Sequence, residues 1–351
     1  MSEMNTDWNE ELVADVLADQ YGIAVETVEM VPMGTDTINR RVLTADGRRL
    51  LVKEYGATVD LTAVRAAWDM AEYCRAAQLP VPRVWPDQDG SFVAVAEGSA
   101  WAVVDEAPGR VATSAMTVAR AEQIGMVLGR MHRVLAAYPL PRLRQHTRWR
   151  TGSVEDAMVK AGAVLAAAKR QQHPDVVLLS HELNQRCDDL RAHVDGLRAG
   201  LPEEFVEQAV HADFTRTNML VLADVVTGVI DFRGARAFPA WELGRGAFDP
   251  RTVATSDQWA DCALVMIQAY RSENPTLPLA DVVACVRVAL LYMLFSFFGA
   301  VTSEYALPEE AEAGLQRHWH ERQTSIRRLL DRFEDFEDAL RSSAEQSGGR
   351  P

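Results

Sequence analysis

The stretch HADFTRTNMLVLADVVTGVIDF, residues 211–232, decides the fold of this 351-residue chain. Two β-rich runs within it, 219–222 and 225–230, predict a hairpin around an Ala-Asp turn. The helical periodicity of the sequence from Gly109 to about Leu340 predicts that this hairpin is embedded among helices. A hairpin folds the residues before it and after it back toward one surface, so polar groups at its two ends are expected to meet.

Three polar side chains at the ends of the hairpin have the spacing that phosphoryl transfer requires. Asp213 and Asn218 precede the hairpin in the pattern H-x-D-x-x-x-x-N, and Asp231 follows it. One carboxylate must accept the proton of an attacking hydroxyl, while a second carboxylate and an amide oxygen hold Mg²⁺ against a triphosphate. We expect Asp213 to be the base and Asn218 and Asp231 to be the metal ligands. The alternative is that all three are turn or cap residues, which Asp and Asn favour.

The rest of the chain predicts an α+β fold of two lobes, because a single core is unusual at this length. Strands are predicted over 28–32, 40–44, 49–54, 91–96 and 100–105, and helices over 8–21, 61–77, 124–135 and 153–168, the last opened by a Ser153–Asp156 capping box. We expect a small antiparallel-sheet N-lobe over 1–108 and a larger, mainly helical C-lobe over 109–351. The tail from about 342 is expected to be disordered.

Lysine is scarce in this chain, whose positive charge is otherwise carried by arginine. Lys160 and Lys169 lie in a helical pattern, but Lys53 lies near the end of the predicted strand 49–54. A compact ammonium at that place can reach the α- and β-phosphates of a nucleotide. An ordinary surface lysine at a strand end is the alternative.

The segments HADFTRTNML and TGVIDFRGA, with LPVPRV and GRMHRVL before them, resemble the aminoglycoside phosphotransferase and choline kinase family over about residues 33–246. This family has a protein-kinase-like fold and includes homoserine and methylthioribose kinases. The resemblance implies that nucleotide lies beneath residues 34–39, and adenine against the backbone that follows the last predicted strand. The binding residues implied are Gly34, Thr35, Thr37, Asn39, Lys53, Asp105 and Ala107.

Departures from the family pattern concern the acids around the predicted site. The helical Glu that pairs with the strand lysine in the family is replaced by Ala66-Ala67-Trp68, and Asp69 and Glu72 are the nearest acids. Either acid could pair with Lys53, or both could be solvated. Glu242 lies where the family tends to carry an Asp that braces the catalytic loop, and little weight is given to that role.

Two further side chains were weighed for a role at the site. Arg216 follows the proposed base closely and could touch the transferred phosphate or an anionic substrate group, or be a surface arginine. We include it with Asp213 and Lys53 among the catalytic candidates. His132 is more typical of a core histidine than of a catalytic group.

Composition excludes several classes of protein. With 36 Lys+Arg against 50 Asp+Glu the net charge is −14, which argues against nucleic-acid binding through bulk charge. The acidic N-terminus predicts no signal peptide, and the apolar run 288–301 is too short to span a bilayer. The four cysteines lack metal-ligand spacing, and no P-loop is present. We therefore expect a cytoplasmic protein with neither a nucleic-acid partner nor a membrane.

The predicted function is transfer of the γ-phosphate of ATP, with GTP as an alternative, to a hydroxyl group of a small molecule, with Mg²⁺ as cofactor. The acceptor is expected beside the Asp213 loop and helices around 150–200 and 285–305. Acids outnumber arginines over 303–338, which suits a cationic acceptor or simply a solvated helix face. An antibiotic-modifying enzyme is the first hypothesis. A homoserine-kinase-like metabolic kinase and a nucleotide-binding pseudokinase are the alternatives.

Overall fold

The computed structural model describes residues 10–31, 37–145, 147–300 and 309–348, which form two compact units. The first unit is the described part of Met1–Arg110 together with Met219–Leu222 and Thr227–Gly234, and the second holds the remainder. Most of the hairpin thus belongs to the first unit. The sequence had predicted that all of 109–351 forms one lobe. The reason for the difference is that the hairpin strands pair with the segment around Gly109.

The first unit contains an antiparallel sheet with the strand order β1-β2-β3-β6-β4, and β5 pairs with β6. Its elements are α1 (Glu10–Tyr21), β1 (Val25–Val31), β2 (Thr37–Thr44), β3 (Arg49–Tyr55), α2 (Leu61–Ala76), β4 (Val84–Trp85), β5 (Ala94–Ala96) and β6 (Ser99–Asp105). The predicted sheet with one inserted helix is confirmed. The strand predicted over 91–96 is shorter, because the amide of Ser91 donates to the Asp87 carboxylate in a turn.

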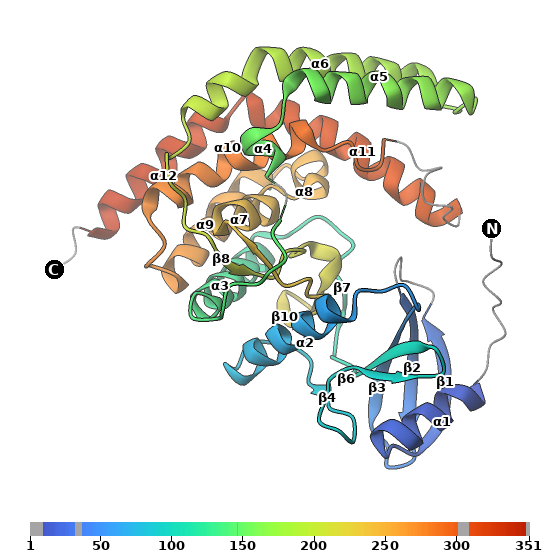
Figure 1. Cartoon of the computed structure of the whole chain (residues 1–351). Helices are drawn as coiled ribbons and strands as arrows, with labels where there is room; N and C mark the ends of the chain where they lie inside the picture. Colours follow the sequence, from blue (N-terminus) through green and yellow to red (C-terminus); the bar gives the residue numbers. More distant parts are fainter. Residues whose placement is uncertain (1–9, 32–36, 146, 301–308, 349–351) are drawn as a thin grey trace. The chain divides into compact units, whose positions relative to one another are not determined.

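Helix α1 covers one face of this sheet (Figure 1). Val13, Val16 and Leu17 lie on one stripe of the helix and are buried against Val42 and Leu50 of the sheet. Burying a side chain of this size contributes about 1.5–3 kcal/mol, so the stripe fixes the helix on the strands that carry the site.

The predicted hairpin is present as β9 (Met219–Leu222) and β10 (Val225–Val229), and β7 (Arg110–Val111) pairs with β9. Gly109 has φ +107°, and a Cβ there would lie 2.7 Å from the carbonyl oxygen of Val221. Only glycine allows this approach, and the hydroxyl of Thr227 donates to the Pro108 carbonyl beside it. The hairpin is thereby held on the segment that leaves the first sheet.

The second unit is mainly helical, as predicted. Its elements are α3 (Val118–Leu135), α4 (Arg148–Thr151), α5 (Val154–Arg170), α6 (Val176–Ala199), β8 (Gln208–Val210), η1 (Arg216–Asn218), β11 (Ala235–Ala237), α7 (Pro239–Ala247), α8 (Pro250–Thr255), α9 (Trp259–Glu273), α10 (Leu279–Phe295), α11 (Glu309–Leu330) and α12 (Phe333–Gly348). Strands β8 and β11 pair and were not predicted, because three residues are too few to show a period. Helix α12 continues to Gly348 where a disordered tail from about 342 was expected.

Helices α3 and α9 cross closely and set the position of a buried histidine. A Cβ on Gly125 would lie 2.2 Å from the Met266 carbonyl oxygen, and one on Gly129 would lie 2.5 Å from that of Tyr270. The two glycines therefore permit a crossing that places His132 against Tyr270.

Helix α10 is apolar on nearly every side and is buried within the second unit, which accounts for the long apolar run in the sequence. Across the described residues, none of the helices combines the length and the apolar character needed to span a membrane.

Candidate active site

The loop that follows β8 holds Asp213 and Asn218 against each other. The side-chain amide nitrogen of Asn218 donates to Asp213 twice, to the backbone oxygen at 2.9 Å and to Oδ2 at 3.0 Å. The backbone amide of Asp213 donates to Nδ1 of His211 at 3.1 Å. The structure therefore brings the predicted base and one predicted metal ligand together within the second unit.

Glu242 on α7 braces this loop from below. Its carboxylate is 0% exposed and accepts hydrogen bonds from the amides of His211, at 3.2 Å, and Ala212, at 2.7 Å. Ala212 has φ +71°, a left-handed conformation that costs a non-glycine residue about 1 kcal/mol or more. The hydrogen bonds to Glu242 support that turn. These contacts fit the bracing role that the family resemblance suggested for this position.

His132 completes the support of Glu242. Its Nε2 lies 3.0 Å from the Glu242 carboxylate, and its Nδ1 lies 2.9 Å from the hydroxyl of Tyr270. Burial alone would raise the pKa of Glu242, but the hydrogen bond and charge of His132, with the charges of His211 and Arg245, hold that pKa below its usual value. The prediction of a satisfied core histidine fits these contacts.

Arg245, also on α7, contacts the predicted base and was not predicted from the sequence. Its Nη2 lies 3.3 Å from Oδ1 of Asp213, and its side chain is 14% exposed. The guanidinium also faces the rings of Trp241, at 4.8 Å, and Tyr292, at 5.2 Å. Its position three residues after Glu242, on the same face of α7, is the signal that could have revealed it.

Arg216 is bound elsewhere than at the predicted reaction centre. One guanidinium nitrogen donates to the carbonyls of Ala112, at 3.1 Å, and Thr113, at 2.9 Å, and Nε lies 3.3 Å from Asp249. These contacts favour a role in holding the loop to neighbouring segments, in place of the catalytic contact that the sequence predicted.

In the first unit, Lys53 and Asp231 form an ion pair. Lys53 lies on β3 and is 8% exposed, whereas the Asp231 side chain is 43% exposed. Asp231 has φ +62°, which turns the chain sharply after β10. Lys53, to which the scarcity of lysine in the sequence drew attention, thus contacts Asp231, a predicted metal ligand.

Helix α2 presents an aromatic ring to Lys53, and neither predicted acid pairs with it. The ammonium lies 5.8 Å from the ring centre of Trp68, whose indole N–H donates to the Tyr55 hydroxyl at 3.1 Å. Glu72 is paired with Arg75 on its own helix, and burial raises the pKa of Asp69. Of the alternatives that the sequence left open, these contacts favour the one in which neither helical acid pairs with Lys53, whose carboxylate partner is Asp231.

The residues implied for nucleotide binding are described in part. Gly34 and Thr35 lie outside the described residues. The Thr37 hydroxyl donates to the Asn39 side chain at 3.1 Å, and Asp105 accepts from the Trp85 indole at 2.8 Å. The backbone of Ala107 makes no hydrogen bond within the described chain. Its amide can therefore donate, and its carbonyl can accept, a hydrogen bond with an adenine ring.

The two predicted metal ligands each offer an oxygen of the kind that Mg²⁺ binds. The Asn218 amide nitrogen donates to Asp213, and no hydrogen bond to its Oδ1 is made among the described residues. Asp231 offers a half-exposed carboxylate at the other end of the hairpin. One or two protein oxygens completed by phosphates and water are what Mg²⁺ takes in phosphoryl-transfer sites.

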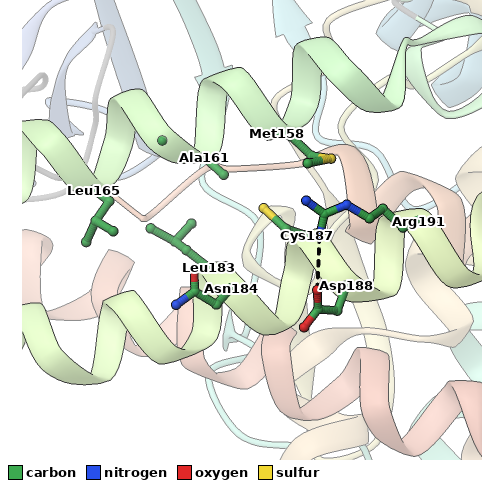
Figure 2. A pocket seen from close by; sticks show the side chains of 9 residues that line it. Met158, Ala161, Leu165, Leu183, Asn184, Cys187, Asp188 and Arg191 are labelled. Carbon is green, nitrogen blue, oxygen red and sulfur yellow. Dashed lines mark hydrogen bonds and ion pairs between the residues drawn. The ribbon is translucent and has the colours of Figure 1, made fainter.

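A groove of about 420 Å³ lies between α5 and α6 (Figure 2). It is lined by Met158, Ala161, Gly162, Leu165, Leu183, Asn184, Cys187, Asp188 and Arg191, and Asp188 pairs with Arg191 across 3.0 Å. None of the predicted site residues lines it, so it is a separate feature of this helix pair.

A family model and a curated relative match the sequence of this chain. The family model described as phosphotransferase enzyme family matches residues 27–279. A homoserine kinase of Zymomonas mobilis subsp. mobilis is 23% identical over 203 residues, and the match covers 58% of this chain and 58% of that kinase. The chain therefore matches less than two thirds of the length of this curated relative.

Solved structures share the fold at low identity. An amicoumacin kinase in complex with AMP-PNP, Ca²⁺ and its antibiotic has a TM-score of 0.57 at 16% identity, covering 90% of this chain and 93% of that one. A spectinomycin phosphotransferase in complex with ADP and spectinomycin has a TM-score of 0.60 at 11% identity, covering 91% and 97%. A microcompartment-associated aminopropanol kinase has a TM-score of 0.56 at 14% identity, covering 92% and 98%. The predicted kinase-like fold is confirmed.

Proposed function

We propose a small-molecule kinase activity for this chain, which belongs to the phosphotransferase enzyme family. The observation that supports the proposal is the Asp213–Asn218 pair, in which the Asn218 amide nitrogen donates both to the backbone oxygen and to the carboxylate of Asp213. In the reaction the acceptor hydroxyl oxygen bonds to the γ-phosphorus of ATP while the bond to the β,γ-bridging oxygen breaks. The hydroxyl proton passes to Asp213, and ADP leaves.

The roles of the other residues follow from their chemistry. Lys53 provides a point charge for the α- and β-phosphates, and Asn218 and Asp231 would hold Mg²⁺, which neutralises charge on the phosphates. GTP remains the alternative donor. Asn39 and the backbone of Asp105 and Ala107 are proposed to bind the nucleotide.

An antibiotic acceptor is the first candidate from the sequence, and the names of two structural neighbours support it. A small amino alcohol is the second candidate, supported by the matched homoserine kinase and by the aminopropanol kinase. The pseudokinase alternative is disfavoured, because a module that only binds nucleotide has no use for a base held by several side chains.

The test is an ADP-release assay against antibiotics, amino alcohols and hydroxy acids, run on the wild type and Asp213→Asn. We expect acceptor-dependent release by the wild type only, with AMP-PNP affinity alike in both proteins. Tight nucleotide binding without turnover of any acceptor would favour the pseudokinase, and equal turnover by both proteins would remove Asp213 as the base.

A further inference from the structure

Arg322 on α11 is a buried arginine for which the described chain supplies no carboxylate. It is 3% exposed, and its Nη1 donates to the Ser296 hydroxyl at 2.9 Å and to the Phe298 carbonyl at 3.0 Å. Its Nη2 lies 2.6 Å from Nε2 of His318, and its Nε has no hydrogen-bond partner in the described structure. A buried charge without a counter-charge is costly, so this environment calls for an anion.

Two other arginines of the same unit donate to backbone carbonyls at helix ends, although Nε and Nη2 of Arg186 have no hydrogen-bond partner in the described structure. Arg186 donates to the carbonyls of Met293 and Leu294, at the last turn of α10. Arg328 donates to the Val253 carbonyl at 2.8 Å, near the end of α8. The C-terminal end of a helix carries partial negative charge that favours a cation. Arg322 instead meets a hydroxyl, a carbonyl beyond the helix and an imidazole.

The imidazole of His318 adds a hydrogen-bond donor next to this charge. A guanidinium can only donate, so Nε2 of His318 must accept and the ring proton must lie on Nδ1. Burial, and then the positive charge of Arg322, lowers the pKa of His318 to about 3, which keeps the ring neutral. Among the described residues, nothing accepts from Nδ1–H. The ring also packs edge-on, at 6.0 Å between ring centres, against Phe298, which is 47% exposed.

This donor group is connected to the predicted base. Arg245 contacts Asp213, and its guanidinium lies 5.2 Å from the ring centre of Tyr292. Burial, opposed by Tyr292 and assisted by the charge of Arg245, lowers the pKa of Arg322 to about 10. Tyr292 lies one helical turn before Ser296 on α10, and Ser296 accepts from Arg322, so the two arginines contact the same part of α10.

The acids near this group are already committed to other partners. Asp213 pairs with Arg245, and Asp249 pairs with Arg216 at 3.3 Å. Glu321 pairs with Arg251. The negative charge that would balance Arg322 must therefore come from outside the described chain.

We infer that the acceptor carries a carboxylate, which binds at Arg322, His318 and Arg245 while its hydroxyl group faces Asp213. This inference rests on the proposed kinase function and replaces the cationic acceptor predicted from the acidic composition. A hydroxy acid or a hydroxy amino acid has the required chemistry, because its carboxylate can accept hydrogen bonds from the Arg322 guanidinium. The bonds made and broken are those of the kinase reaction above, and the carboxylate only positions the hydroxyl.

Matched acceptor pairs test the inference. ADP release is measured with L-homoserine, L-serine and 4-hydroxybutyrate, each against its own carboxamide, and with spectinomycin and 1-amino-2-propanol as acceptors without a carboxylate. We expect kcat/KM for at least one acid to exceed that for its amide about tenfold or more, since a charged hydrogen bond contributes that much. A carboxamide, spectinomycin or aminopropanol used as well as or better than every acid would overturn it.

Two variants on the same helix locate the effect. Arg322→Gln should raise KM for the preferred acid about tenfold while leaving KM for ATP unchanged. Arg328→Gln is the matched control, because it also loses bonds to backbone carbonyls but should keep the preference for the acid. Loss of the preference in both variants, or in neither, contradicts the assignment. If Arg322→Gln does not fold, His318→Phe removes the Nδ1 donor and should weaken the same preference.

Thermal unfolding with malonate separates this inference from the kinase proposal. At equal ionic strength, sodium malonate should raise the Tm of the wild type and of Arg328→Gln above the value in sodium chloride, but not that of Arg322→Gln. If no nucleotide binds and no acceptor turns over, the kinase proposal fails, and this shift alone decides whether the anion site exists. If malonate does not raise the Tm and no acid is preferred over its amide, the anion site is overturned. Turnover of another acceptor would then still support the kinase proposal.

Discussion

Two carboxylates of the predicted site, Asp231 in the first unit and Asp213 in the second, are each paired with a cation of their own unit, yet they are held very differently. Within the described residues Asp231 pairs with Lys53, and its side chain is 43% exposed. Asp213 is held from two sides, by Arg245 at 3.3 Å and by Asn218 at 3.0 Å, and its loop is tied to Glu242.

The difference matches the work proposed for each group. A metal ligand must leave its resting partner and turn toward an ion, which one exposed ion pair permits at low cost. A general base must keep its oxygen in one place, because proton transfer depends on short distances. The variants below would break or sharpen this contrast.

The largest effect is expected at the held carboxylate. Asp213→Asn should lower kcat about 10³-fold, the size of a general-base contribution, while the Kd for AMP-PNP stays unchanged. Steady-state ADP release and calorimetric titration measure the two quantities. Asp195→Asn, an exposed acid on α6, is the control and should behave like the wild type.

The exposed carboxylate should respond in the opposite way. Asp231→Asn should weaken binding of Mg²⁺–AMP-PNP about 10- to 100-fold, because a metal ligand is lost, with little change in the affinity for AMP-PNP in EDTA. Equal affinity for the metal complex in wild type and variant would show that Asp231 is not a ligand.

The brace under Asp213 should show in stability as well as in rate. Glu242→Gln keeps the shape but loses the charge that two amides and His132 contact, so the free energy of unfolding should fall by about 1–3 kcal/mol. Urea unfolding followed by circular dichroism measures this. A variant as stable as the wild type but slow in turnover would mean that Glu242 acts on the reaction and not on the loop.

The aromatic face under Lys53 should contribute less. Trp68→Leu removes the ring that lies 5.8 Å from the ammonium, and KM for ATP should rise about two- to fivefold, the size of a partly exposed cation–π contact. Trp68→Phe keeps a ring and loses only the bond to Tyr55, so it should remain near the wild type. Equal effects of the two substitutions would assign the role to that hydrogen bond.

The last prediction concerns acid pH. Burial, followed by the charges of Arg322, Arg216, Arg245 and Arg251, lowers the pKa of His318 from 6.5 to about 3. The unfolded chain therefore binds a proton that the folded chain rejects between these values. Stability from this group is present above pH 6.5 and is lost as the pH falls toward 3. His318→Phe should flatten the decline in Tm between pH 6.5 and 4.5, and an unchanged slope would place the titration elsewhere.

Local patterns were enough to predict most of the elements and to select the candidate site residues. The hairpin, the inserted helix of the first unit and the Ser153 cap depend on period and turn chemistry within a few residues. Short strands such as β8 and β11 carry no such signal and appear only once their partner is known.

The amino-acid sequence by itself determined the kinase-like elements, the Asp213–Asn218 motif and the strand position of Lys53. Only the tertiary structure decided which groups contact one another. Lys53 contacts Asp231 and the Trp68 ring, and the Asp213 loop contacts Glu242 and Arg245. Arg322 contacts His318 and has no carboxylate partner among the described residues. The physical reason is that the energy of a charge depends on burial and on the groups that surround it, and packing brings those groups together from distant parts of the chain.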